Sequence, residues 1–116
     1  MKRIWITFLF LFLAAQPSMA ALYGDGRQTV TTGGTAVALS AAEQLFSELT
    51  VCAETNNTGI IVVGLTPVAA LATREGVPLN AGDCWSTYRH GDLRNILIDT
   101  TIDTDGVTFS WALGVE

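Results

Sequence analysis

Few side chains of this chain could carry out catalysis, and His90 is the only histidine. It lies in a segment that predicts a turn, with Asp92 just after it and Ser86 a few residues before. A serine, a histidine and an aspartate can act as nucleophile, general base and orienting acid. Nothing in this spacing brings the three side chains together, so we predict a solvated turn, no catalytic residue and no enzymatic activity.

Acidic residues gather near the C-terminus, where Asp99, Asp103 and Asp105 precede Gly106. Calcium binds several carboxylate and carbonyl oxygens on a tight turn, so these residues could gather around an ion. The string lacks the other ligand positions of a calcium loop and its distal glutamate. We therefore favour a hairpin turn in which Asp105-Gly106 supplies a positive φ, and we predict no metal site and no cofactor.

Cys52 and Cys84 are the two cysteines of the chain. Disulfides persist in exported proteins, and a bridge here would close a loop worth about 4 kcal/mol in the chain-entropy model. The alternative is two separate, half-buried thiols, because sequence does not give the Cα separation that a bridge requires. Neither cysteine has a histidine nearby, so thiolate catalysis is not predicted.

A candidate contact surface is formed by Trp85, Tyr88 and Arg89, since aromatic and arginine side chains dominate protein and sugar contacts. Trp85 could equally belong to the core, whereas Trp111 follows the inward period of the last strand. Asn56-Asn57-Thr58 matches a glycosylation sequon, which matters only in a eukaryotic secretory pathway.

These residues must be positioned by short strands, because apolar and polar residues alternate through most of the chain after Leu49. We predict strands over 28–31, 35–39, 49–54, 60–63, 84–88, 95–100 and 107–111. We predict turns over 24–26, 56–59 and 90–92, a turn or two of helix over 41–45, and a long ordered connection over 66–81. The segments on either side of Asn56–Gly59 form the clearest hairpin signal.

The predicted fold is all-β: a small antiparallel sandwich or barrel of six to seven short strands. Function in such a domain would lie in subunit contacts along edge strands and loops. The expected core consists of Leu49, Val51, Ile60, Val62, Leu79, Ile96, Ile98, Val107, Phe109 and Trp111.

Residues 1–20 have the pattern of a secretory signal. Lys2 and Arg3 provide the positive end, Ile4–Ala15 is apolar, and small residues end the segment at Ala20. We predict a hydrophobic helical signal segment, which gives transient membrane association, followed by a single β-sandwich domain over 21–116. An uncleaved tether and a start site placed too far upstream are the alternatives.

The chain is acidic, with a formal net charge of −5 at pH 7. Loss of Lys2 and Arg3 with the signal would make it more acidic still. Nucleic acid is disfavoured as a direct partner, because binding it depends on cationic side chains.

Several stretches taken together resemble a family of small virion structural proteins of tailed bacteriophages. They are Tyr23–Thr32, Gly34–Ser40, Thr50–Gly59, Gly76–Asp83, Asp92-Leu93, Ile96–Asp99 and Asp105–Phe109. The shared order is a strand before a threonine-glycine turn, an N-T-G hairpin, a P-L-x-x-G-[DE] turn into a strand, and a final hairpin.

The resemblance implies a compact β-sandwich that decorates or joins parts of a virion and has no catalytic residues. Its partners would be other virion proteins or further copies of itself, and its location the virion, with a precursor exported through the signal segment. The alternative is an exported bacterial β-sandwich module, periplasmic or secreted, that recognises glycan or protein.

Overall fold

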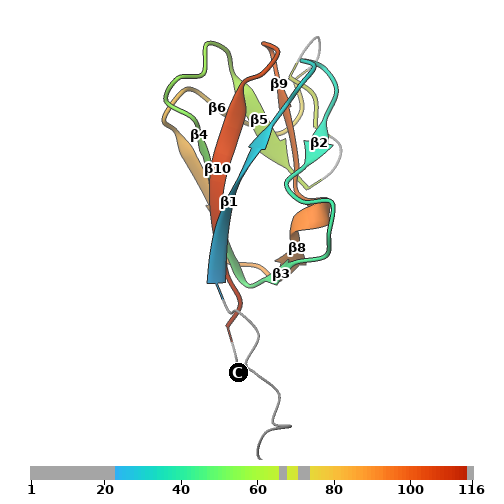
Figure 1. The fold of residues 1–116 in the computed structure, drawn as a ribbon, viewed down its shortest axis with the longest axis vertical. Coiled ribbons are helices and arrows are strands. Elements are labelled where there is room, and N and C mark those ends of the chain that lie inside the picture. The colour runs from blue at the N-terminus through green and yellow to red at the C-terminus, as the bar shows by residue number, and fades with distance from the viewer. Residues whose placement is uncertain (1–22, 66–67, 71–73, 115–116) are drawn as a thin grey trace, which may run out of the picture.

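The computed structural model describes residues 23–65, 68–70 and 74–114, which form short strands and connections (Figure 1). The strands are β1 (Tyr23–Thr29), β2 (Val37–Ala38), β3 (Leu45–Phe46), β4 (Glu48–Ala53), β5 (Ile61–Gly64), β6 (Val77–Leu79), β7 (Cys84–Thr87), β8 (Gly91–Asp92), β9 (Leu97–Thr100) and β10 (Gly106–Ala112). A 3-10 turn, η1 (Leu93–Asn95), precedes β9. The predicted signal segment over 1–20 lies outside the described residues.

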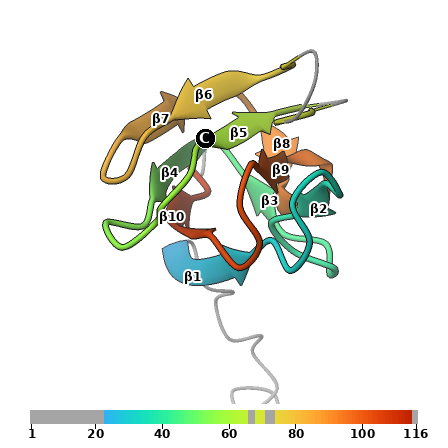
Figure 2. The ribbon, with the colours of Figure 1, turned by 90° about the horizontal axis from the view of Figure 1, so that it is seen from above.

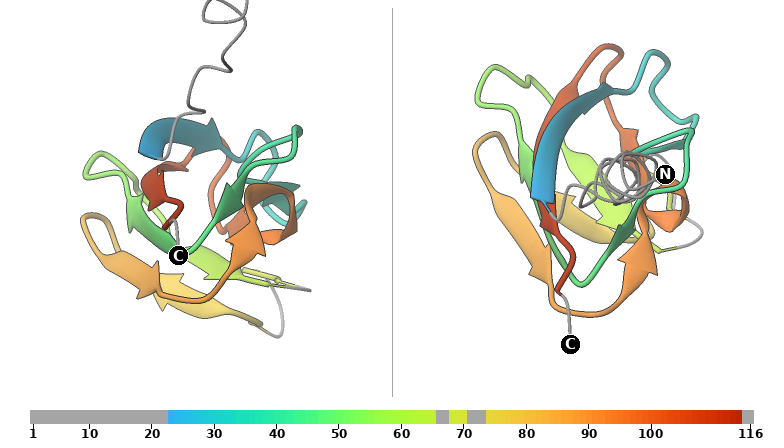
Figure 3. Two further views of the ribbon diagram at one scale, coloured as in Figure 1. Left: turned by 90° about the horizontal axis from the view of Figure 1, so that it is seen from below. Right: turned by 60° about the horizontal axis from the view of Figure 1, so that its bottom comes forward.

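Two four-stranded antiparallel sheets account for most of these strands. Sheet A has the order β1-β10-β4-β7, and sheet B has the order β2-β9-β5-β6. Seen from above, the sheets face each other and come together at β6 and β7 (Figure 2). The short pair β3-β8 lies at the lower end, as the view from below shows (Figure 3). The predicted antiparallel all-β class is confirmed. In the described part of the chain, no helix is long and apolar enough to cross a membrane.

The core lies between the two sheets and matches most of the expected residues. Ile60 was predicted to be buried and is only half-buried, because β5 begins one residue later. Ile61 and Val63 therefore face the main core, while Val62 faces the opposite side of sheet B. Trp111 is partly buried and packs against the core. The expected residues that are buried are Leu49, Val51, Val62, Leu79, Ile96, Ile98, Val107 and Phe109.

Glycines opposite aromatic residues explain two wrong turn predictions. Gly24 and Gly26 belong to β1, where they pair with Trp111 and Phe109 of β10. A Cβ on Gly26 would lie 2.6 Å from Cζ of Phe109, so the aromatic ring occupies the place of the missing side chain. Such cross-strand covering keeps glycine in a strand instead of a turn.

The same arrangement recurs at the predicted 90–92 turn. Gly91 lies in β8 opposite Phe46, and a Cβ there would meet the Phe46 ring at 2.7 Å. The predicted helix over 41–45 is also wrong, since β3 begins at Leu45. Ser40 accepts a hydrogen bond from the Ala42 amide at 3.1 Å and so closes a local turn instead of capping a helix.

The two predicted hairpins are connections between sheets. Asn56–Gly59 links β4 of sheet A to β5 of sheet B, and residues 101–105 link β9 to β10 in the same way. Each polar run suited a tight turn, but the flanking strands turn out to be in opposite layers. The predicted positive φ at Asp105-Gly106 is also wrong: it falls on Thr104, with φ 72, and Gly106 is extended within β10.

The connection predicted over 66–81 contains β6, an edge strand of sheet B. Pro78 sits in this strand opposite Val62. A proline is tolerated at an edge because its missing N–H can fall on the side without a neighbour.

Residues 68–70 and 74–76 lie over the outer side of sheet B, where Ala69 and Glu75 exchange two backbone hydrogen bonds of 2.8 and 2.9 Å. Val68 and Ala70 pack on Val62 and Leu97 in a second small apolar cluster. We call the outer side of sheet B, formed by Val62, Leu97 and Asp99, the covered face.

Candidate functional site

The outward side chains of sheet A form a polar surface, because β1, β10, β4 and β7 alternate between the core and the outside. The pairing aligns these side chains in rows across the sheet. We call this surface the open face; it consists of Asp25, Arg27, Glu48, Thr50, Cys52, Glu54, Cys84, Ser86, Thr108 and Ser110.

Cys52 and Cys84 form a disulfide on the open face, so of the two alternatives that the sequence allows the structure has the bridge. They lie directly opposite each other in β4 and β7, with a Cα separation of 4.0 Å. The Ala53 amide donates to the Asp83 carbonyl at 2.8 Å, so the cysteine pair falls at the neighbouring position without ladder bonds, where side chains are closest. The bridge encloses β5 and β6, so one covalent link in sheet A spans half of sheet B.

An ion pair crosses β10 at the same end of the open face. Nε of Arg27 donates to Oε1 of Glu54 at 2.7 Å, and Nη2 donates to Oε2 at 3.1 Å. The hydrogen bond to Glu54, followed by the attraction between the charges, raises the pKa of Arg27 above its ordinary value. This paired geometry is the strong form of an Arg–carboxylate contact and orders both side chains.

Small hydroxyl side chains occupy the middle of the open face. Oγ1 of Thr50 and Oγ of Ser86 are 2.9 Å apart, and the register places Ser110 beside Thr50. Because these side chains are short, the face is hollowed between the longer side chains at its rim. An open depression of about 390 Å³ is lined by Asp25, Gly26, Thr50, Cys52, Thr108, Phe109 and Ser110.

Two exposed tyrosines stand at the lower end of the open face. Tyr23 begins β1 and is 79% exposed, and Tyr88 follows β7 and is 78% exposed. Glu48 lies between them, since it shares a cross-strand row with Tyr23 through β10 and lines a second depression with Tyr88. Arg89, next to Tyr88, is exposed as well.

Trp85 does not join this exposed group. It pairs with Val51 across β4 and β7 and packs partly buried against the main core. The structure thus separates the three residues of the predicted contact surface: Tyr88 and Arg89 face solvent, and Trp85 faces inward. The role of Tyr88 and Arg89 in contacts stays a prediction.

The serine, histidine and aspartate considered for catalysis do not contact one another through hydrogen bonds in the described structure. Ser86 is paired with Thr50 on the open face. Asp92 is bound by Arg94, whose Nη2 and Nε donate to Oδ2 at 2.8 and 3.0 Å. His90 is exposed and makes no side-chain hydrogen bond within the part of the chain described here.

The acidic residues considered for calcium all accept hydrogen bonds from backbone N–H groups. Asp105 accepts from the Gly59 amide at 2.7 Å, and Asp103 accepts from Gly33 at 2.7 Å. Asp99 is 1% exposed and accepts from Ala70 at 2.8 Å. It also accepts from Gly34 at 2.9 Å and Thr100 at 2.8 Å. Among the described residues, no group of three or more His, Cys, Asp or Glu side chains could hold a metal.

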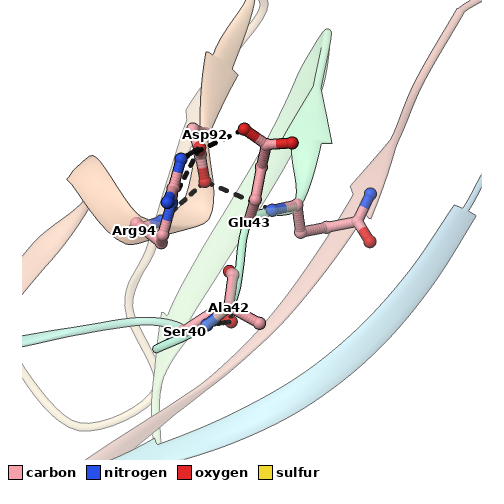
Figure 4. A network of polar contacts seen from close by, with 6 residues as sticks. Ser40, Ala42, Glu43, Asp92 and Arg94 are labelled. Atoms are coloured by element: carbon pink, nitrogen blue, oxygen red, sulfur yellow. Dashed lines mark hydrogen bonds and ion pairs between the residues drawn. The ribbon is translucent and has the colours of Figure 1, made fainter.

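A separate polar network joins η1 to the segment before β3 (Figure 4). Asp92 caps η1 by accepting from the Arg94 amide at 3.0 Å and also accepts from the Gln44 amide at 3.2 Å. Nη2 of Arg94 reaches Oε2 of Glu43 at 3.1 Å. The side-chain hydrogen bonds from Arg94 are the main cause that lowers the pKa of Asp92 to about 2. This corner is therefore held by charge, whereas the core is held by apolar contacts.

The β1 side of the open face was not predicted from the sequence. The residues Tyr23, Asp25 and Arg27 alternate with Gly24 and Gly26, and this period of two is a strand signal. The glycines concealed it, because they also suit a turn. Recognising that Phe109 and Trp111 needed partners without side chains would have revealed the strand.

Comparison with known proteins gave no relative: no family model matches the chain, and neither the curated proteins nor the solved structures contain a match.

Proposed function

We propose that this chain is a non-enzymatic virion structural protein of a tailed bacteriophage, of the decoration or particle-joining type, which binds its neighbours through the open face. The observation that carries the proposal is the contrast between the outer sides of the two sheets. The chain covers sheet B with its own residues 68–70 and 74–76. No described residue packs over the outer side of sheet A, which is hollowed in the middle and bordered by exposed tyrosines.

The chemistry of the open face suits contact with another protein. Tyrosine and arginine are enriched where proteins meet, and Tyr23, Tyr88 and Arg27 lie at the rim of this surface. The hydroxyl groups of Thr50 and Ser86 can exchange hydrogen bonds with a partner without the cost of burying a charge. Carboxylates outside the open face close turns and corners, as Asp99 and Asp105 do.

The local structure also supports the resemblance to virion proteins. Their P-L-x-x-G-[DE] turn corresponds to Pro78 through Asp83, which ends β6 and leads into β7. Gly82 has φ 86 there, and Asp83 accepts a hydrogen bond from the Asn80 amide at 3.0 Å. A glycine and an acidic residue are thus what this turn requires.

Mass spectrometry of particles purified from the strain that carries the gene tests the proposal. We expect peptides of this chain in the particles at a fixed ratio to the major capsid protein. The variant Thr50→Arg, which fills the middle of the open face, should lower that ratio at least tenfold. Ile102→Arg is the matched control, because Ile102 is exposed in the connection between the sheets and lies off this face. Absence of the native chain from particles contradicts the proposal.

The second candidate function is an exported module that binds glycan or protein, and the Cys52–Cys84 disulfide favours it. Disulfides form and persist in oxidising compartments such as the bacterial periplasm. The same mass spectrometry applied to the periplasmic fraction separates the candidates. A chain that begins after Ala20, is found in the periplasm and is missing from particles supports the exported module.

A further inference from the structure

The free edge of β1 offers the longest row of available backbone groups among the described edge strands. β1 runs from Tyr23 to Thr29 and pairs with β10, and none of the described strands lies along its other side (Figure 1). The other edge strands are shorter: β2 has two residues, β6 has three and contains Pro78, and β7 has four. An edge of this length can template the addition of a further strand.

The hydrogen-bond pattern identifies which residues present their backbone to the free edge. The Val30 amide donates to the Asp105 carbonyl at 3.0 Å, and bonded positions in an antiparallel ladder alternate from there. Gly24, Gly26 and Gln28 therefore direct their N–H and C=O groups toward β10. Asp25 and Arg27 direct their N–H and C=O groups away from the sheet.

One end of this edge is already closed. The Thr29 amide donates to Oε1 of Gln28 at 3.1 Å, and Nε2 of Gln28 donates to the Ala38 carbonyl at 2.7 Å. The stretch that remains for a partner is Tyr23 through Arg27. Its side chains on the open face are a tyrosine, a carboxylate and a guanidinium.

The charged side chains on this stretch of one copy are complementary to those on the same stretch of a second, antiparallel copy. If two β1 strands pair antiparallel about Gly26, each Asp25 lies opposite Arg27 of the other copy. A pairing centred on Asp25 sets two carboxylates against each other, and one centred on Arg27 sets two guanidinium groups against each other. Opposite charges stabilise a cross-strand pair and like charges destabilise it, so the sequence selects the register about Gly26.

That register also agrees with the backbone and with the ion pair on the open face. It places Asp25 opposite Arg27 at positions where both residues direct their backbone groups outward, as ladder bonds require. Arg27 binds Glu54 through Nε and Nη2. Its Nη1 makes no hydrogen bond within the described residues and can donate to a second carboxylate.

We propose that two copies of this chain pair antiparallel along β1, centred on Gly26, to form a two-fold dimer in which the two A sheets become one continuous sheet. The contact is isologous, since the same edge serves both copies. It joins the two open faces into one larger surface. The inference rests on the proposed function in that a contact protein gains binding surface by such pairing.

Sedimentation of the protein expressed from its full-length gene, over a range of concentrations, tests the pairing. We expect a dimer that dissociates on dilution. Asp25→Pro removes an N–H that points to the free edge and leaves the bonds to β10 in place, so it should raise the dissociation constant at least tenfold. The thermal midpoint of the diluted monomer should stay within a few degrees of the native one.

Charge variants test the register and do not depend on a proline. Asp25→Arg and Arg27→Asp should each raise the dissociation constant at least fivefold, and the double variant Asp25→Arg/Arg27→Asp should recover most of the loss. Arg74→Asp is the matched control, because Arg74 is exposed in the segment over sheet B, and it should have no effect. A native protein that is monomeric at all concentrations, or charge variants without recovery in the double variant, would overturn the proposal.

The two proposals fail in different experiments. A protein that dimerises through β1 and is absent from particles keeps the pairing and loses the virion role. A protein that is present in particles and monomeric in solution, with Asp25→Pro incorporated at the native ratio, keeps the virion role and loses the pairing.

Discussion

The outer sides of the two sheets differ in how they meet the solvent. On the covered face, Val62 is fully buried under Val68 and Ala70, although it lies outside the main core. On the open face, the corresponding positions are threonine, serine and a cystine, and no segment of the described chain packs over them. One fold thus combines a sheet buried on both sides with a sheet buried on one.

This difference shows that composition decides which face a protein must cover for itself. An apolar side chain such as Val62 gains free energy when it leaves water, so a covering segment is stabilising there. Hydroxyl groups gain no comparable free energy when they leave water, so a face formed by them is stable in solvent without a covering segment. The open sheet is instead held across its strands by the Cys52–Cys84 disulfide and by the pair between Arg27 and Glu54.

Removal of the disulfide should have the largest effect on stability. Cys52→Ala/Cys84→Ala opens a link across a sequence separation of 32 residues, and the chain-entropy model gives a loss of about 4 kcal/mol in the free energy of unfolding. Guanidinium denaturation of the variant and the native protein measures the difference. The matched control is Thr50→Ala/Ser86→Ala in the next row, which removes one exposed hydrogen bond and should cost less than about 1 kcal/mol. Equal losses in both variants would show that the open sheet does not depend on its covalent link.

The buried carboxylate under the covering segment should have the next largest effect. Asp99→Ala leaves the amides of Ala70 and Thr100 without this acceptor, and each buried unsatisfied donor costs about 1–3 kcal/mol. The Gly34 amide also loses Asp99 but keeps the Thr100 carbonyl as an acceptor at 3.2 Å. We expect a total loss of about 3 kcal/mol and faster hydrogen exchange at the Ala70 amide, measured by denaturation and NMR.

Asp103→Ala is the control for this change, because Asp103 is exposed and accepts a hydrogen bond from one amide, that of Gly33. It should cost less than about 1 kcal/mol and leave exchange at Ala70 unchanged. If Asp99→Ala matches this control, the covering segment is held by apolar contacts alone.

The sequence predicts the all-β class and the longer strands well, because the alternation of apolar and polar residues is a local property. Leu49, Val51, Val107 and Phe109 are buried as expected, since each strand repeats its pattern over several residues. The sequence allows both a bridge and two separate thiols, and the structure shows the bridge between Cys52 and Cys84. The short strands β3 and β8 were missed because two residues carry no detectable period.

The local sequence pattern does not show which sheet a strand joins or which distant segment packs over it. The Asn56–Gly59 segment has the composition of a hairpin turn, and only long-range pairing shows that it crosses between sheets. Asp99 follows the polar alternation of β9, a pattern that is typical of residues facing water. It is buried because residues 68–70, distant in sequence, lie over it. The open face was only half recognised, since its β1 strand depends on aromatic rings from the other end of the chain.

The smallest effect is expected at the corner outside both faces, where Asp92 binds Arg94. Because the pKa of Asp92 falls to about 2 in the folded protein, its contribution to stability is complete above the unfolded pKa of about 4 and is lost as the pH falls toward 2. Asp92→Asn should thus lower the thermal midpoint at pH 5, and its gap from the native protein should close between pH 4 and pH 2. Arg94→Gln removes the main cause of the pKa shift and should show the same closing gap. A gap that stays constant over this range would mean that the carboxylate acts through its cap on η1 and not through its charge. Asp92 would then resemble Asp99, which holds backbone amides under the covered face, more than it resembles the ion pair on the open face.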